Sequence, residues 1–157
     1  MPNYFNTSLK NLVYRLRKFK SVLDLELKNE ILRHEDVIIK MITQEQLYEK
    51  GIEGRGIEIS SYNPYKPRTI KKKIRKGQPY DRVTLKDTGE FYASLHVEHD
   101  DEGFYVTSSD DKSQYLLKRY GKTIFRLTDE NLKVLLHDYI RPSLKQKMKE
   151  YIKNGRQ

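Results

Sequence analysis

Apolar residues recur at helical spacing near the start of the chain, and this stripe constrains the fold more than any other feature. At about 100° per residue, the apolar side chains between residues 9 and 31 fall within roughly 120° of one helical face. They are Leu9, Leu12, Val13, Leu16, Phe19, Leu23, Leu27 and Ile31. Thr7 and Ser8 precede them as candidate N-caps. The pattern predicts a long amphipathic helix that must bury one face against another part of a structure.

The apolar spacing resumes after residue 36 and continues to Gly51, a residue type that commonly ends helices. One straight helix over residues 8–50 would be about 65 Å long, since a helix rises about 1.5 Å per residue. That length exceeds the width of a domain of this size. We therefore predict a break between His34 and Asp36.

The last third of the chain carries the signals of a β-hairpin followed by helices. Residues 96–99 and 104–107 favour strands, and the acidic segment between them favours a turn. A short helix, capped by Ser109 or Asp110, is expected to end at Tyr120 before Gly121.

Thr128 is the predicted cap of the next helix, with Leu127 and Leu132 as its hydrophobic staple. Pro142 interrupts the following apolar stripe, so we expect a kink or a restart there, with Pro142 in the first turn of the last helix. That last helix is expected to pack on the N-terminal one. The predicted class is α+β: a long N-terminal amphipathic helix, a small antiparallel sheet with a β-hairpin, and C-terminal helices kinked or restarted at Pro142, all within one domain over residues 1–157.

Composition limits how much core this fold can bury. Leu, Ile, Val and Phe make up 41 of the 157 residues, and 34% of the residues are charged. The core is therefore expected to be thin, so a partner or self-assembly could supply further burial. With no cysteine there is no disulfide, thiolate nucleophile or cysteine-bound metal. We expect a soluble protein without membrane contact, because no signal pattern and no membrane-length apolar stretch occurs.

The net charge of +9 is concentrated in one segment. Glycines and prolines predict an irregular loop at about residues 51–84, and within it residues 66–82 hold eight basic residues against Asp81. The basic residues, our candidate contacts to DNA or a protein partner, are Lys66, Arg68, Lys71, Lys72, Lys73, Arg75, Lys76 and Arg82. Such a loop could bind nucleic acid without sequence preference, through phosphates and the nearby Tyr65 and Tyr80. It could equally be solvated, or ordered by an acidic neighbour.

Two groups of residues have side chains of the kinds that metal sites and hydrolytic chemistry use. His96-Val97-Glu98-His99 groups two imidazoles with a carboxylate, but strand alternation places His96 and Glu98 on one face and His99 on the other. The acidic residues of the hairpin turn and of the segment after it could hold Mg²⁺ for nuclease chemistry, but a solvated turn and a helix start explain them better. They are Asp100, Asp101, Glu102, Asp110 and Asp111. We predict no catalytic, cofactor or metal site, and no enzyme.

From about Gln44 to Glu150 the order of short motifs resembles the tail-completion and neck proteins of tailed bacteriophages, also called virion morphogenesis proteins. Tyr62-Asn63-Pro64-Tyr65 falls where that family has a Trp-x-Pro-Leu stretch before a basic loop. The other residues that carry the resemblance are Leu85, Asp87, Thr88, Gly89, Ser94, Leu95, Tyr120, Gly121, Arg141 and Pro142. This chain has Tyr62 in place of the family's tryptophan and lacks its Gly-Thr pair.

The resemblance implies a structural virion protein that assembles in the host cytoplasm. It implies a homo-oligomeric ring at the head-tail junction or the tail end, beside portal, connector or tail proteins, with the basic loop facing DNA or an acidic neighbour. The alternative is a stand-alone, sequence-nonspecific nucleic-acid-binding protein that uses residues 66–82.

Overall fold

A long helical rod forms the first third of the molecule. The computed structural model describes residues 4–100 and 103–154. Helix α1 (Tyr4–Arg33) leads through a bend into α2 (Glu35–Lys40) and a wider, π-helical segment, η1 (Met41–Lys50). The predicted break is confirmed at His34, whose backbone leaves helical geometry (φ −106°, ψ 23°).

The rod ends where predicted but begins earlier. Gly51 stops it in the left-handed conformation (φ 65°), where a side chain is disfavoured. Thr7 and Ser8 already lie within α1, so the prediction that they cap the helix is wrong. The apolar stripe marks the helical face but not the helix start.

The segment predicted to be irregular contains a helix. After a single turn at Ile59–Ser61 (η2), residues Pro67–Arg75 form α3. Pro67 occupies the first helical turn, where its fixed φ suits a helix and its missing N–H costs nothing. The expectation of an irregular loop over 51–84 is therefore wrong for these nine residues, because a basic run outside a regular apolar pattern can still be helical.

The predicted β-hairpin is confirmed. After the short helix α4 (Glu90–Ala93), strands β1 (Leu95–His99) and β2 (Phe104–Ser108) pair antiparallel, with Val97 opposite Val106. Helix α5 (Ser113–Tyr120) then ends before Gly121 (φ 86°), as predicted. It starts later than its predicted caps, because the Asp110 carboxylate accepts a bond from the Lys112 N–H (2.9 Å) and holds a turn there.

After the turn η3 (Lys122–Phe125), the C-terminal third forms a second rod: α6 (Asp129–Val134), the π-helical segment η4 (Leu135–Ile140) and α7 (Arg141–Asn154). Thr128 caps it as predicted, since its hydroxyl accepts a bond from the Asn131 N–H (3.2 Å). The kink expected near Pro142 takes the form of the wide turns of η4 just before it. Wide turns accommodate a residue that lacks an N–H and crowds the preceding carbonyls.

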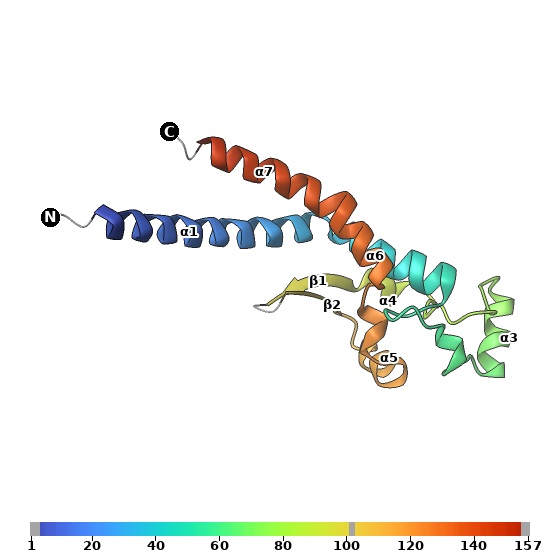
Figure 1. The fold of residues 1–157 in the computed structure, drawn as a ribbon. Helices are drawn as coiled ribbons and strands as arrows, with labels where there is room; N and C mark the ends of the chain where they lie inside the picture. The colour runs from blue at the N-terminus through green and yellow to red at the C-terminus, as the bar shows by residue number, and fades with distance from the viewer. Residues whose placement is uncertain (1–3, 101–102, 155–157) are drawn as a thin grey trace.

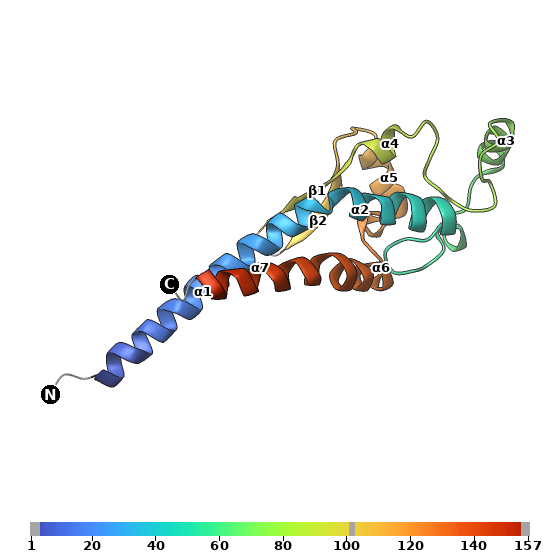
Figure 2. The same ribbon diagram turned by 90° about the horizontal axis from the view of Figure 1, so that it is seen from above.

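The two rods lie side by side, as predicted for the last helix. Helix α7 runs back along α1, and the rings of Phe19 and Tyr151 are 6.1 Å apart. Figure 1 shows both termini at one end of an elongated molecule and α3 at the other. Figure 2 shows the first turns of α1 continuing past the end of α7.

The core sits where the rods, the hairpin and α5 meet, not along α1. Its fully buried side chains include Ile38, Ile42, Leu47, Ile124 and Leu135. A buried glutamine, Gln46, links the rods: its side-chain oxygen accepts the Thr128 N–H (2.9 Å), and its amide donates to the Arg126 carbonyl (3.0 Å). The molecule is mixed α+β, as predicted. Among its described helices none is long and apolar enough to span a membrane.

Candidate interaction surface on helix α3

Helix α3 carries most of the basic residues that the sequence singled out. It stands at the end of the molecule opposite the two termini (Figure 1). Residues 68, 71 and 75 are spaced three and four apart, so they share one helical face, while residue 73 lies on the opposite face. The structure thus divides the predicted basic loop into an inward and an outward set.

Lys73 belongs to the inward set and is only 5% exposed. Its ammonium group donates to the Lys86 carbonyl (2.7 Å), the Thr84 hydroxyl (3.3 Å) and the Gln78 side chain (3.3 Å). It also lies 5.1 Å from the centre of the Tyr65 ring. Lys73 was among the residues predicted to contact DNA or a protein partner, and this prediction is wrong. Because its side chain is buried, Lys73 anchors α3 instead.

Lys72 and Lys76 converge on one carboxylate. Each ammonium group lies 2.5 Å from a different oxygen of Asp87. Hydrogen bonds from Lys72 and then Lys76 hold the pKa of Asp87 down to about 2. Asp87 therefore neutralises part of the basic segment and ties α3 to the loop before α4.

Arg82 is used internally as well. Its Nε donates to the Tyr48 carbonyl (2.8 Å), and its Nη1 is 2.8 Å from the Asp81 carboxylate. These bonds join the end of the basic segment to η1. Arg82 is half-buried and does not lie on α3.

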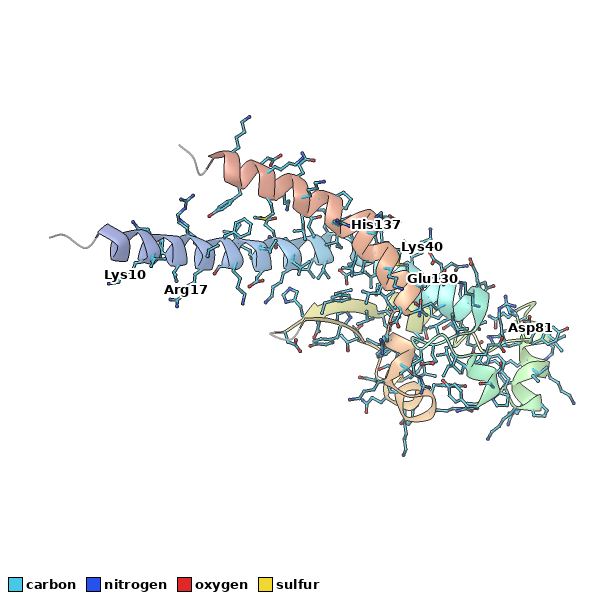
Figure 3. All side chains as sticks on the ribbon, in the orientation of Figure 1. Lys10, Arg17, Lys40, Asp81, Glu130 and His137 are labelled. Carbon is cyan, nitrogen blue, oxygen red and sulfur yellow. The ribbon has the colours of Figure 1, made fainter. Side chains whose placement is uncertain are left out.

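The outward set is what remains for a partner. Lys66, Arg68, Lys71 and Arg75 are exposed, and none of them forms an ion pair with any residue in the described ranges. We call these four residues the α3 basic face. At the distal end of the molecule, side chains of α3 extend away from the body (Figure 3). The arrangement can bind an extended anionic surface.

Sequence reasoning missed the group of hydrogen bonds around Thr84 that supports α3. The Tyr65 hydroxyl accepts a bond from the Thr84 N–H (2.9 Å) and lies 3.2 Å from the Thr84 hydroxyl. The Tyr92 hydroxyl donates to the Thr84 carbonyl, and burial raises the pKa of Tyr92. These bonds join Tyr65 and Tyr92 to a fully buried threonine. The spacing of residues in the sequence does not reveal such a contact.

Several of the residues that carry the motif resemblance shape or support the backbone. Leu85 and Gly89 both have positive φ (55° and 101°), so the loop that carries Asp87 is held in conformations that most residues avoid. The Ser94 hydroxyl bonds to that of Ser108 (2.7 Å), across the base of the hairpin. The remaining motif residues lie in regular positions: Thr88 before α4, Leu95 buried in β1, Tyr120 buried before Gly121, and Arg141 with Pro142 exposed in α7.

The His96-Val97-Glu98-His99 segment divides between the two faces of β1. His96 Nε2 lies 3.2 Å from a Glu98 oxygen, and the Tyr105 hydroxyl donates to the other (2.7 Å). Bonds from Tyr105 and His96 lower the pKa of Glu98. His99 pairs with Phe104 on the opposite face. Within the described ranges no three His, Asp or Glu side chains gather as a metal site would require.

Comparisons with protein-family models, with curated proteins and with solved structures found no match to this chain.

Proposed function

We propose that the chain is a structural subunit of a tailed-phage virion, of the neck or tail-completion kind, that assembles as a ring with copies of itself beside portal, connector or tail proteins. The observation that carries this proposal is the part of the α1 apolar stripe that α7 leaves uncovered. The motif order in residues 44–150 resembles that of phage neck and tail-completion proteins, and this resemblance supports a phage particle as the assembly.

The uncovered part is well defined. Helix α7 covers α1 from about Phe19 onward, and Ile31 at the far end is buried. Before Phe19, on the same stripe, Leu9 is 58%, Val13 45% and Leu16 59% exposed. Three large aliphatic side chains on one helical face are thus left to solvent in the single chain.

Association would relieve this exposure. Fully burying one aliphatic side chain is worth roughly 1.5–3 kcal/mol. A subunit that completes its burial only in an assembly has a reason to keep such a stripe, whereas a monomer has none.

Quantitative mass spectrometry of purified phage particles that encode the chain tests the proposal. We expect a small, fixed number of copies per particle, as a closed ring requires, and far fewer copies than the major capsid protein has. Absence of the chain from intact particles would contradict it.

A second candidate function is nucleic-acid binding by a stand-alone protein. The α3 basic face favours it, because four cations remain exposed and unpaired within the described ranges. Such binding would be strongly salt-dependent and indifferent to sequence.

A further inference from the structure

The start of α1 is basic as well as apolar. Residues 1–23 contain Lys10, Arg15, Arg17, Lys18 and Lys20 and no acidic residue. Lys10 and Arg17 point to the same side of α1 (Figure 3). Together with Leu9, Val13 and Leu16 they form what we call the α1 tip surface. It needs a partner that offers both an apolar groove and negative charge.

The hairpin region of the same chain has the opposite charge. Residues 88–111 contain no Lys or Arg. Seven acidic residues occur in this range, of which Asp101 and Glu102 lie outside the described residues; the other five are Glu90, Glu98, Asp100, Asp110 and Asp111. Glu90 lies 3.8 Å from the Lys112 ammonium group, and Glu98 lies 3.2 Å from His96. Of the five, Glu98 is exposed on the outer face of β1, and Asp111 is exposed just after β2.

An apolar groove runs beside this acidic hairpin. It has a volume of about 620 Å³ and lies along β2, between the strand and the segments around α5 and α6. Its apolar lining comes from Phe104, Val106, Leu117, Phe125, Leu127 and Leu132. Of the two cations that also line it, Arg126 is paired with Asp129 (3.1 Å).

Within one chain the two surfaces are held apart. The hairpin is fixed to α2, where the Glu35 carboxylate accepts the Val97 N–H (2.8 Å). The first turns of α1 project past the end of α7, away from the body (Figure 2). The tip of one chain therefore cannot reach the groove and the acidic residues of the same chain, but it can reach those of a second copy.

We propose that the α1 tip surface of one copy docks on the acidic hairpin and the β2 groove of a second copy. Leu9, Val13 and Leu16 enter the groove, and Lys10 and Arg17 face Glu98 and Asp111. Pairing of two α1 tips with each other is disfavoured, since each tip carries five positive charges. The contact joins two different surfaces, so repetition of it generates a ring or a filament. This inference rests on the proposed function and names the contact that would build the ring.

Engineered cysteines test the contact directly, because the chain has none of its own. Val13→Cys chains are mixed with Tyr105→Cys chains and oxidised at low ionic strength. Tyr105 is 43% exposed at the groove. We expect a mixed disulfide dimer at a yield at least about tenfold above that of a matched pair, Val13→Cys with Tyr80→Cys, since docking raises the local thiol concentration. Tyr80 is 53% exposed and follows α3 in the chain, and the adjacent Asp81 lies at the α3 end of the molecule, away from the hairpin (Figure 3).

Charge reversal in the same assay gives a second readout. Lys10→Glu with Arg17→Glu in the Val13→Cys chain should lower the yield to the control level, as should Glu98→Lys with Asp111→Lys in the Tyr105→Cys chain. Mixing the two reversed chains should restore it. Yields equal to the matched control in the unreversed chains, or no restoration with both reversals, would overturn the inference.

The outcome is separable from that of the proposed function. Cross-linking that stops at closed dimers in a Val13→Cys, Tyr105→Cys double variant would keep the contact and contradict the ring. Presence of the chain in particles at ring-like copy number, without the cross-link, would keep the function and reject the contact.

Discussion

Glu30 is a fully buried carboxylate on α1, and the packing of α7 against α1 depends on the cations that balance its charge. The Lys147 ammonium lies 2.9 Å from it and also binds Glu26, while the Arg33 guanidinium is 3.1 Å away. Burial alone would raise the pKa of Glu30, but hydrogen bonds from Lys147 and Ser143 hold it below its ordinary value. The pair therefore joins the two rods through charge as well as through Phe19 and Tyr151.

Replacing Lys147 with methionine should destabilise the fold, because Glu30 would then keep its charge in a buried place with one partner fewer. We expect the free energy of unfolding to fall by about 1–3 kcal/mol in urea titrations. Lys149→Met, at an exposed position of the same helix, is the control and should change it by less than about 0.5 kcal/mol. Equal effects of the two substitutions would show that the pair adds nothing.

Asp87 gives a prediction about pH. Its pKa is lowered from 3.8 to about 2 in the folded chain, so its contribution to stability is complete above pH 3.8 and is lost as the pH falls through about 2. An NMR titration of the carboxyl carbon should give a midpoint near pH 2. In a Lys72→Met, Lys76→Met chain the midpoint should move up towards 3.8, whereas Lys71→Met should leave it in place. A midpoint that the double substitution leaves unchanged would show that Lys72 and Lys76 do not lower the pKa of Asp87.

At the scale of the element, α1 has two halves with different roles. A Leu9→Ser, Val13→Ser, Leu16→Ser chain should melt within a few degrees of the parent in circular dichroism, because these side chains are already exposed. Its self-association in sedimentation experiments should be lost. Ile31→Ser, at a buried position of the same helix, should instead lower the melting temperature clearly. A large loss of stability in the triple variant would place the tip in the core of the single chain.

Helix α3 sets the salt dependence of any nucleic-acid binding. Five to seven phosphate contacts from the whole basic segment 66–82 would give a slope of log K against log salt of roughly −4 to −6. With only the four residues of the α3 basic face available, we expect about −3.6 on duplex DNA.

An Arg68→Gln, Lys71→Gln, Arg75→Gln chain should reduce that slope to about −0.9. Lys118→Gln, at an exposed position of α5, serves as the control and should leave the slope unchanged. A slope that does not respond to the triple substitution would remove α3 from the binding surface.

For the whole molecule, the position of the core predicts a gradient of local stability. Buried side chains gather where the two rods meet the hairpin, whereas Leu9, Val13 and Leu16 near the start of α1 are exposed to solvent. Amide hydrogen exchange of the single chain should be slowest in residues 38–47 and fast in residues 9–16. Assembly should slow exchange in the latter range; uniform protection along α1 in the single chain would contradict this picture.

Local features were predictable because they depend on residues close together in the chain. The break at His34, the stop at Gly51, the hairpin turn and the Thr128 cap each follow from backbone preferences or hydrogen bonds that span a few residues. Helix α3 was missed for the same reason, since its only strong local signal is Pro67 and its anchor, Lys73, bonds to residues more than ten positions away. Local signals do not reveal contacts of that range.

By itself the sequence determined the amphipathic face of α1, the hairpin and the place of the C-terminal kink, because the spacing of apolar residues and the turn chemistry act locally. Only the tertiary structure decided which charges remain free. Lys72 and Lys76 are neutralised by Asp87, and Lys73 is buried, because α3 folds back on the loop before α4. The tertiary structure also decided which apolar residues stay exposed, since α7 has 14 residues to cover the 30 of α1 and ends before it reaches the tip.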